Sequence, residues 1–284
     1  GFKCLTFSAV NFYRSIVMTD THIKGYSDID LLVICEKYYS YDSASVKQIL
    51  ASYNTRYSYS QLSKLRSIDN ASPYTGNVYD DLRTIRVQSE SILSRKYLKC
   101  DISHPKAIKI TNQDLHRDVD IVTAGWYDNV NSIINDQNIT YRGIQVYDKV
   151  ANNRCAADYP FLSIERINTK SVNTGGRLKR MIRFLKNIKA DSKQKIDLSS
   201  FDINAICYNI DIDAYKDLHY LYLVTIVFLQ LHKIAYDESY ANSITSVDGK
   251  EYIFRGNNKR REVATMLQNV STIYSILKEQ HLII

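Results

Sequence analysis

The pattern of apolar and polar residues changes near the middle of the chain. In the first half, short runs rich in Ile and Val are separated by polar stretches, which is typical of β-strands. The expected strands are residues 28–35, 107–110 and 119–124, and residues 140–147 have the pattern of a hairpin. We expect the three strands to belong to one sheet.

A helix is predicted between the first two strands. Residues 79–98 contain neither Gly nor Pro and place apolar side chains at near-helical spacing, with acidic residues early and basic residues late. These charges suit the helix dipole. Residues 38–72 are polar and rich in Ser and Tyr, so we expect a helix at 46–53 and loop elsewhere in that segment. The first half therefore mixes strands and helices.

Helical spacing dominates the second half. After a segment of mixed polarity at residues 149–174, with a turn at 158–160, residues 177–190 carry an apolar stripe opposite a basic face. Further helices are expected at residues 201–208, 214–236 and 260–279. The pattern predicts an α+β protein with two domains, a sheet-containing lobe at residues 1–150 and a helical lobe at residues 151–284.

The composition of the 284 residues is that of a globular protein. Hydrophobic residues make up 45% and charged residues 24%, which excludes a disordered, collagen-like or coiled-coil chain. Thirty-seven Lys and Arg against thirty Asp and Glu give a formal charge of +7. Because a positive protein attracts polyanions, nucleotides and nucleic acid become plausible ligands.

Cysteine usage and hydropathy indicate the compartment. The 5 cysteines are widely spaced and contain no C-x-x-C pair, so neither a disulfide framework nor a zinc site is indicated. The apolar stretch at residues 218–234 contains His, Gln and Lys and reads as a buried helix. Residues 1–15 carry polar and charged groups and no cleavage site of a secretory leader. We therefore expect a cytoplasmic protein with no membrane partner.

The first candidate site residues lie in the run GYSDIDLLVI at residues 25–34. In a strand, alternate side chains share a face, so Asp28 and Asp30 project together. Two carboxylates this close repel each other unless a cation lies between them. The pair therefore favours a divalent metal ion, and surface decoration is the alternative for a D-x-D in a strand.

A third acid follows in the run RDVDIV at residues 117–122, where Asp120 is flanked by Val119 and Ile121. If this strand lies beside the first, Asp120 completes a two-metal site. Such a site clamps the attacking and leaving oxygens of phosphoryl transfer.

These runs occur in the order found in a known family. GYSDIDLLVI, VDIVTA, and RLKRMIRFLKNIK followed by DLSSFDINAICYN resemble the polymerase-beta-type nucleotidyltransferases over roughly residues 15–210. Within that group they resemble the cGAS/DncV-like nucleotidyltransferases and their oligoadenylate-synthase relatives. The resemblance implies a polymerase-beta-like mixed sheet with helices, plus a C-terminal helical lobe of oligoadenylate-synthase type that closes the nucleotide cleft.

The resemblance also implies metal ligands. It assigns two Mg²⁺ or Mn²⁺ ions to Asp28, Asp30 and Asp120. It further implies that Asp120 helps to deprotonate the attacking hydroxyl, which is general-base chemistry.

Two nucleotide contacts come from the helical lobe. The resemblance assigns Lys186 to the donor triphosphate and Ser200 to the nucleotide, with Ser199 as the neighbouring alternative. Without the resemblance, Lys186 would belong to a solvated basic face and Ser200 would be a helix N-cap.

The chain departs from the family before the first acid, where relatives carry a Gly-Ser pair that cradles triphosphate. No Gly occurs in that region. Ser15 is the nearest match in spacing, Ser8 is the nearest in local sequence, and Thr19 or Thr21 could replace the usual threonine.

The function implied is template-independent nucleotidyl transfer. Nucleoside triphosphates such as ATP, GTP or dATP would react through 3′-hydroxyl attack on an α-phosphate, releasing pyrophosphate. The product would be a cyclic or linear oligonucleotide that signals to an effector protein in bacterial antiphage defence. Alternatives are a linear DNA or RNA oligomer synthase, a catalytically weak nucleotide-binding regulator, and an antitoxin-like transferase that modifies protein or tRNA.

Overall fold

The computed structural model describes residues 10–11, 29–52, 56–112, 117–256 and 258–283. Contacts divide the chain into two compact units, one with the described residues up to Leu162 and one with those from Ser163 onward. The division lies in the first turn of helix α5 (Pro160–Asn173), whereas the sequence pattern places the boundary at residue 150.

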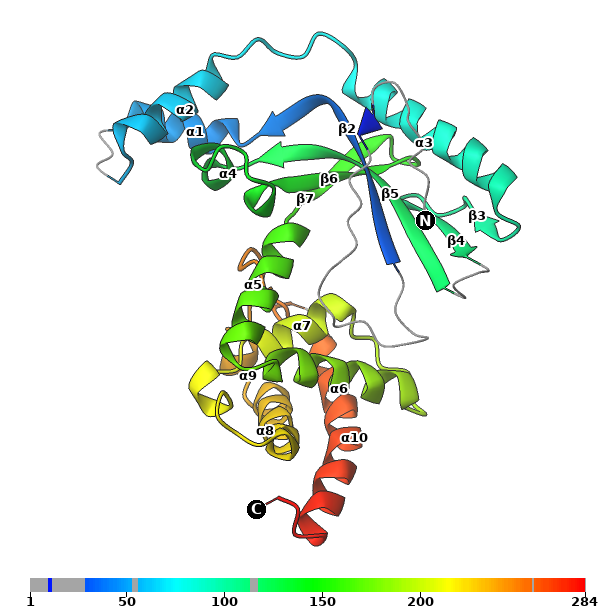
Figure 1. Ribbon diagram of the computed structural model, residues 1–284, viewed down its shortest axis with the longest axis vertical. Coiled ribbons are helices and arrows are strands. Elements are labelled where there is room, and N and C mark those ends of the chain that lie inside the picture. Colours follow the sequence, from blue (N-terminus) through cyan, green and yellow to red (C-terminus); the bar gives the residue numbers. More distant parts are fainter. Residues whose placement is uncertain (1–9, 12–28, 53–55, 113–116, 257, 284) are drawn as a thin grey trace. The chain divides into compact units, whose positions relative to one another are not determined.

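The first unit contains a mixed sheet of seven described strands (Figure 1). They are β1 (Val10–Asn11), β2 (Ile29–Tyr41), β3 (Cys100–Asp101), β4 (Ala107–Asn112), β5 (Arg117–Asp128), β6 (Gly143–Asp148) and β7 (Asn153–Asp158). β5 is central, with β2 parallel along one edge and β4 followed by β6 antiparallel along the other. The three predicted strands lie in this one sheet as β2, β4 and β5.

The sheet has two apolar faces, and one of them packs against helix α3 (Val78–Lys96), which confirms the helix expected at 79–98. The core on that face includes Val33, Cys35, Leu82, Ile85, Val119 and Ile121. The core on the opposite face includes Leu32, Ile34, Ala124, Trp126 and Ile144. Since strand side chains alternate, the odd-numbered residues in these stretches of β2 and β5 face α3, and the even-numbered ones face away.

A smaller helical cluster follows β2. It contains α1 (Ser43–Ala51), α2 (Tyr59–Asp69) and α4 (Val130–Ile134), with Val46, Leu65 and Ile133 buried among them. The prediction of loop for the α2 segment was wrong. The sequence of α2 has a weak apolar pattern, and Leu65 is its only fully buried residue. The N-terminus of α2 is stabilised by a capping box between Ser58 and Gln61.

The hairpin predicted at residues 140–147 was also wrong in its position. Ile139–Tyr141 is a short 3-10 turn, η1, so the residues directly before β6 form no strand, and β6 pairs instead with β5 and β7. The turn between β6 and β7 is stabilised by Asp148, whose carboxylate accepts hydrogen bonds from the backbone N–H groups of Val150 and Ala151. Asn152 supplies the left-handed residue of this turn with φ of 48°.

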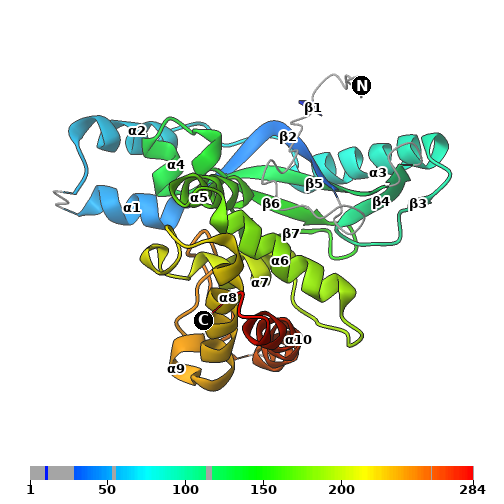
Figure 2. The same ribbon diagram turned by 60° about the horizontal axis from the view of Figure 1, so that its bottom comes forward.

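The second unit is helical. Besides α5 it contains α6 (Arg177–Asp191), α7 (Ser200–Tyr208), α8 (Leu223–Tyr236), α9 (Glu238–Ala241) and α10 (Lys259–Glu279). α8 and α10 lie side by side in both views (Figures 1 and 2). The predicted stripe of α6 is buried in the shared core through Leu178, Met181, Ile182 and Leu185.

Two helix predictions for this unit need correction. Residues 214–236 are not one helix, since the 3-10 turns η2 (Ile212–Ala214) and η3 (Tyr220–Tyr222) precede α8. α5 replaces the predicted turn at 158–160, because Pro160 suits the first position of a helix. None of the described helices is long and apolar enough to span a membrane.

Candidate active site

Two of the three predicted acids meet on the sheet. Asp30 in β2 is the direct register partner of Asp120 in β5. Neighbouring strands lie about 4.8 Å apart, and both residues have even numbers, so both carboxylates lie on the face opposite α3. Asp28 falls outside the described residues. The structure therefore brings Asp30 and Asp120 together, as the sequence pattern predicts.

A lysine from the next strand extends this row. Lys109 in β4 is the antiparallel partner of Asp120, and its Nζ atom lies 3.4 Å from Oδ2 of Asp120. The Lys109 side chain is 44% exposed and that of Asp120 is 20% exposed. Asp30, Asp120 and Lys109 thus form a row across three adjacent strands.

The second carboxylate oxygen of Asp120 is a candidate metal ligand. Oδ1 is buried and has no hydrogen-bond partner among the described residues. Burying an unpaired anionic oxygen costs free energy, which a bound cation offsets. Carboxylate oxygens are also the ligands that Mg²⁺ prefers. Asp30 and Asp120 therefore fit a hard divalent cation.

The structure describes only two of the three predicted acids. In the described ranges, no group of three or more His, Cys, Asp or Glu side chains could hold a metal ion. Asp30 and Asp120 are the two members that these ranges include, and the third member, Asp28, precedes them.

Asp118 lies in the same strand as Asp120 but has a different environment. Its carboxylate accepts a 2.7 Å hydrogen bond from the Thr111 hydroxyl of β4. The Asp118 side chain is exposed, whereas that of Asp120 is half-buried. The two acids of β5 therefore lie in different environments.

Lys186 occupies a buried position in α6, with 9% relative exposure. Burial lowers the pKa of its ammonium group, and the nearby Cys207 thiol acts weakly in the opposite direction. A lysine whose charge is disfavoured by burial is stabilised by an anionic ligand. The interpretation of Lys186 as part of a solvated basic face was therefore wrong.

Ser199 and Ser200 open helix α7 in different roles. Ser199 is the N-cap, and its hydroxyl accepts a 3.1 Å hydrogen bond from the Asp202 N–H and donates a 2.7 Å bond to Oδ2 of Asp202. Lys259 holds the other Asp202 oxygen at 2.7 Å. Ser200 is the first helical residue, is exposed, and has no hydrogen-bond partner in the described part of the chain. The capping role thus belongs to Ser199, and the Ser200 hydroxyl is available to a ligand.

The candidate triphosphate contacts near the N-terminus, which are Ser8, Ser15, Thr19 and Thr21, all lie outside the described residues. Lys109 was missed by sequence reasoning. A signal existed, because Lys109 is flanked by Ile108 and Ile110 just as Asp120 is flanked by apolar residues.

Comparison with known proteins decides the family. The family described as cGAS/DncV-like nucleotidyltransferase C-terminal helical domain matches residues 165–275. A c-di-GMP synthase of Capnocytophaga granulosa is 50% identical over 94% of this chain and 76% of its own length. The chain belongs to the cGAS/DncV-like nucleotidyltransferase family. A second c-di-GMP synthase, from Flavobacteriaceae sp., is 41% identical over 97% of this chain and 77% of its own length.

Solved structures of the family agree with the fold. The STING-associated CdnE c-di-GMP synthase from Flavobacteriaceae sp. matches with a TM-score of 0.83 and 38% identity, covering 95% of this chain and 76% of that one. Membership in the cGAS/DncV-like family confirms the resemblance, the α+β fold class and the C-terminal helical lobe. The protein is thus a nucleotidyltransferase. The individual roles of the candidate site residues stay predictions, and these residues are Asp28, Asp30, Asp120, Ser15, Lys186 and Ser200.

Proposed function

We propose that this nucleotidyltransferase is a c-di-GMP synthase that uses GTP. Three relatives that carry this name are 50%, 45% and 41% identical to the chain over at least 90% of its length. The structural observation that supports the chemistry is the pairing of Asp30 with Asp120 on adjacent strands. Paired carboxylates of this kind suit the divalent cations that nucleotidyl transfer uses.

The reaction proceeds in two equivalent steps. The 3′-hydroxyl oxygen of one GTP forms a bond to the α-phosphorus of the other, the bond to the β-phosphate oxygen breaks, and pyrophosphate leaves. Repetition within the linear intermediate closes the ring and releases a second pyrophosphate. Asp120 takes up the proton of the attacking hydroxyl, since its carboxylate is the half-buried one of the described pair.

Two Mg²⁺ or Mn²⁺ ions complete the proposed site. Asp28, Asp30 and Asp120 would hold them, and the ions would supply Lewis-acid stabilisation of the charge that develops on the phosphate oxygens. Oδ1 of Asp120 supports this assignment, because it is buried and has no hydrogen-bond partner in the part of the chain that the structure describes.

Three further residues are proposed to bind the nucleotide. Lys186 binds the triphosphate, because an anion restores the favourable environment that burial removes from its ammonium group. The exposed Ser200 hydroxyl at the start of α7 contacts nucleotide as well. Ser15 is proposed for the triphosphate on its spacing from the first acid.

A product assay tests this function. The full chain is incubated with α-³²P-labelled GTP and Mg²⁺ or Mn²⁺, treated with phosphatase, and resolved against authentic c-di-GMP. We expect a phosphatase-resistant product from GTP alone that matches c-di-GMP in mass. Parallel reactions with ATP, CTP, UTP and dATP serve as the specificity controls.

Other outcomes contradict the proposal in distinguishable ways. A ladder of longer chains indicates a linear oligomer synthase, and label on protein or tRNA indicates a modifying transferase. Absence of any product across all nucleotides indicates a nucleotide-binding regulator.

The biological role that we propose is production of a signal in antiphage defence, in the cytoplasm. Two similar solved structures are described as STING-associated CdnE c-di-GMP synthases. The proposed partner is accordingly an effector protein that binds the cyclic dinucleotide.

A further inference from the structure

Lys109 places a positive charge beside the position where the proposed function requires a divalent cation. We propose that Lys109 weakens metal binding in the absence of nucleotide and thereby couples metal loading to nucleotide binding. This inference rests on the proposed function, because it concerns the same metal site. Lys109 is a positioning residue in this account, since it acts through the Asp120 carboxylate.

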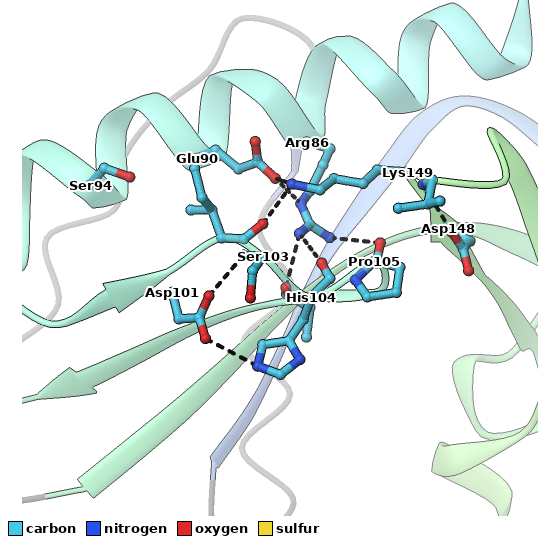
Figure 3. Close-up of polar contacts among 12 residues, drawn as sticks. Arg86, Glu90, Ser94, Asp101, Ser103, His104, Pro105, Asp148 and Lys149 are labelled. Carbon is cyan, nitrogen blue, oxygen red and sulfur yellow. Dashed lines mark hydrogen bonds and ion pairs between the residues drawn. The ribbon is translucent and has the colours of Figure 1, made fainter.

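The pairing of Lys109 with Asp120 is specific. Lys109 lies between two acidic register partners, Asp120 in β5 and Asp101 in β3. The Asp101 carboxylate points to the loop that follows, where it accepts a 2.8 Å hydrogen bond from the Ser103 N–H and lies 3.2 Å from His104 Nε2 (Figure 3). Within the described ranges, the ion pair of Lys109 is therefore with Asp120 alone.

Helix α3, on the opposite face of the sheet, holds the strand that carries Lys109. Arg86 of α3 is fully buried and donates hydrogen bonds to the carbonyl oxygens of His104 and Pro105 (Figure 3). It also donates one to the carbonyl oxygen of Ala107, the first residue of β4. These bonds anchor the strand from its first residue. Lys109 is consequently held in register with Asp120.

In this proposal the Asp120 carboxylate interacts with two cations, the Lys109 ammonium group and the metal ion. Oδ2 of Asp120 lies 3.4 Å from the ammonium group, and Oδ1 is buried without a hydrogen-bond partner among the described residues. A dication bound at Oδ1 would lie within a few ångströms of the ammonium group, so the two positive charges would repel each other. Because both side chains are partly exposed, water and salt reduce this repulsion without removing it.

A bound nucleoside triphosphate should offset the repulsion between the metal ion and the Lys109 ammonium group. Its phosphate oxygens carry negative charge to the same site and offset both the metal ion and the ammonium group. Metal and nucleotide then each strengthen the binding of the other, which is a reciprocal coupling.

Calorimetric titration of the full chain with Mn²⁺, with and without a non-hydrolysable GTP analogue, tests the inference. We expect Lys109→Met to bind Mn²⁺ about tenfold more tightly than wild type without nucleotide, and about equally with the analogue. Lys109→Arg keeps the charge and should behave as wild type. The gain in Lys109→Met should shrink at about 1 M salt.

A matched control is Lys106→Met, which removes an exposed lysine just before β4 that forms no ion pair in the described part of the structure. Thermal unfolding checks that each variant is folded, and Lys109→Gln replaces Lys109→Met if the latter unfolds. Unchanged or weaker Mn²⁺ binding by the neutral variants overturns the role of Lys109. Failure of wild type to bind Mn²⁺ even with the analogue overturns the metal site itself, and with it the proposed function.

Discussion

Acidic side chains on one face of the sheet differ in what their oxygens contact. Asp118 accepts a hydrogen bond from Thr111 at the strand edge. Asp120 lies between Asp30 and Lys109 and keeps one buried oxygen without a described partner. The environment of each carboxylate, rather than its residue type, separates a structural acid from a candidate metal ligand.

Substitution of these two acids should therefore have unequal effects. Asp120→Asn removes the charge with little change in shape, and we expect it to lower c-di-GMP formation about 10³-fold, because several kcal/mol of charge stabilisation is lost. Asp118→Asn is the matched control and should retain wild-type activity. Equal loss of activity in both variants, measured as the initial rate of product formation, would contradict the assignment.

Lys186 should lower the stability of the fold and favour nucleotide binding. Its pKa is lowered by burial, so the folded protein disfavours the charged form that the unfolded chain carries. The cost is present in full below the folded pKa and disappears as the pH rises toward the unfolded value of 10.5. At pH 7, Lys186→Met should unfold with a free energy about 1 kcal/mol higher than wild type, while its use of GTP falls.

The check is urea unfolding of both proteins at neutral and at alkaline pH. The advantage of Lys186→Met should shrink as the pH approaches 10.5. A variant that is less stable than wild type at pH 7 would show that the ammonium group stabilises the fold.

The acids could be predicted from sequence, whereas the pairing of Lys109 with Asp120 could not, for a physical reason. Asp30 and Asp120 each stand between β-branched or apolar residues, a pattern visible in the chain itself. The partner of Asp120 in β4 depends on strand register, which a shift of one residue would change and which local pattern alone does not fix. Here the register is stabilised by contacts of Arg86, far from Lys109 in the sequence.

At the scale of elements, the N-terminus of α7 is assembled from three separated positions. Ser199 and Asp202 form the capping box, and Lys259 at the start of α10 neutralises Asp202, which is 1% exposed. This arrangement fixes the first turn that presents Ser200.

Substitutions at the two serines should separate capping from ligand binding. Ser199→Ala should lower the free energy of unfolding by about 1 kcal/mol, because the N-cap hydrogen bonds are lost. Ser200→Ala should change stability by less than about 0.5 kcal/mol and raise the KM for GTP. Denaturant unfolding and steady-state kinetics check both, and the reverse pattern would assign the nucleotide contact to Ser199.

The buried network of Arg86 ties α3 to the strand that carries Lys109. Besides three carbonyl oxygens, Arg86 contacts Glu90 at 2.8 Å, and Lys149 reaches the same Glu90 oxygen at 2.7 Å (Figure 3). Removing one member of such a network leaves buried polar groups without partners.

Arg86→Met should consequently lower the free energy of unfolding by about 3 kcal/mol. Arg83→Met, on the exposed side of the same helix, should change it by less than about 0.5 kcal/mol. Urea unfolding measures both, and a similar small change in the two variants would mean that the network does not stabilise the sheet.

Elements with strong apolar periodicity could be predicted, and those held by tertiary contacts could not. The stripe of α6 and the spacing of α3 are visible in the sequence and present in the structure. α2 has a weak apolar pattern, and α5 begins at a proline that also suits a turn. The 3-10 turn η2 before α8 ends at Tyr215, and the Tyr215 side chain is fully buried in the core of the second unit.

At the scale of the whole molecule, composition and family agree. A formal charge of +7 suits an enzyme whose substrates are polyanionic nucleotides. The family relationship extends over both units, since the relative from Capnocytophaga granulosa matches 94% of the chain. Composition alone could not select the nucleotide, because the base is chosen by individual side chains that no spacing rule identifies.

A crystal structure of the full chain with Mn²⁺ and a non-hydrolysable GTP analogue would show whether Asp30 and Asp120 hold the metal. Anomalous scattering locates the metal independently of the protein density. We expect manganese peaks about 2.1–2.2 Å from carboxylate oxygens of Asp30 and Asp120. Manganese bound to the nucleotide but away from both aspartates would contradict the account.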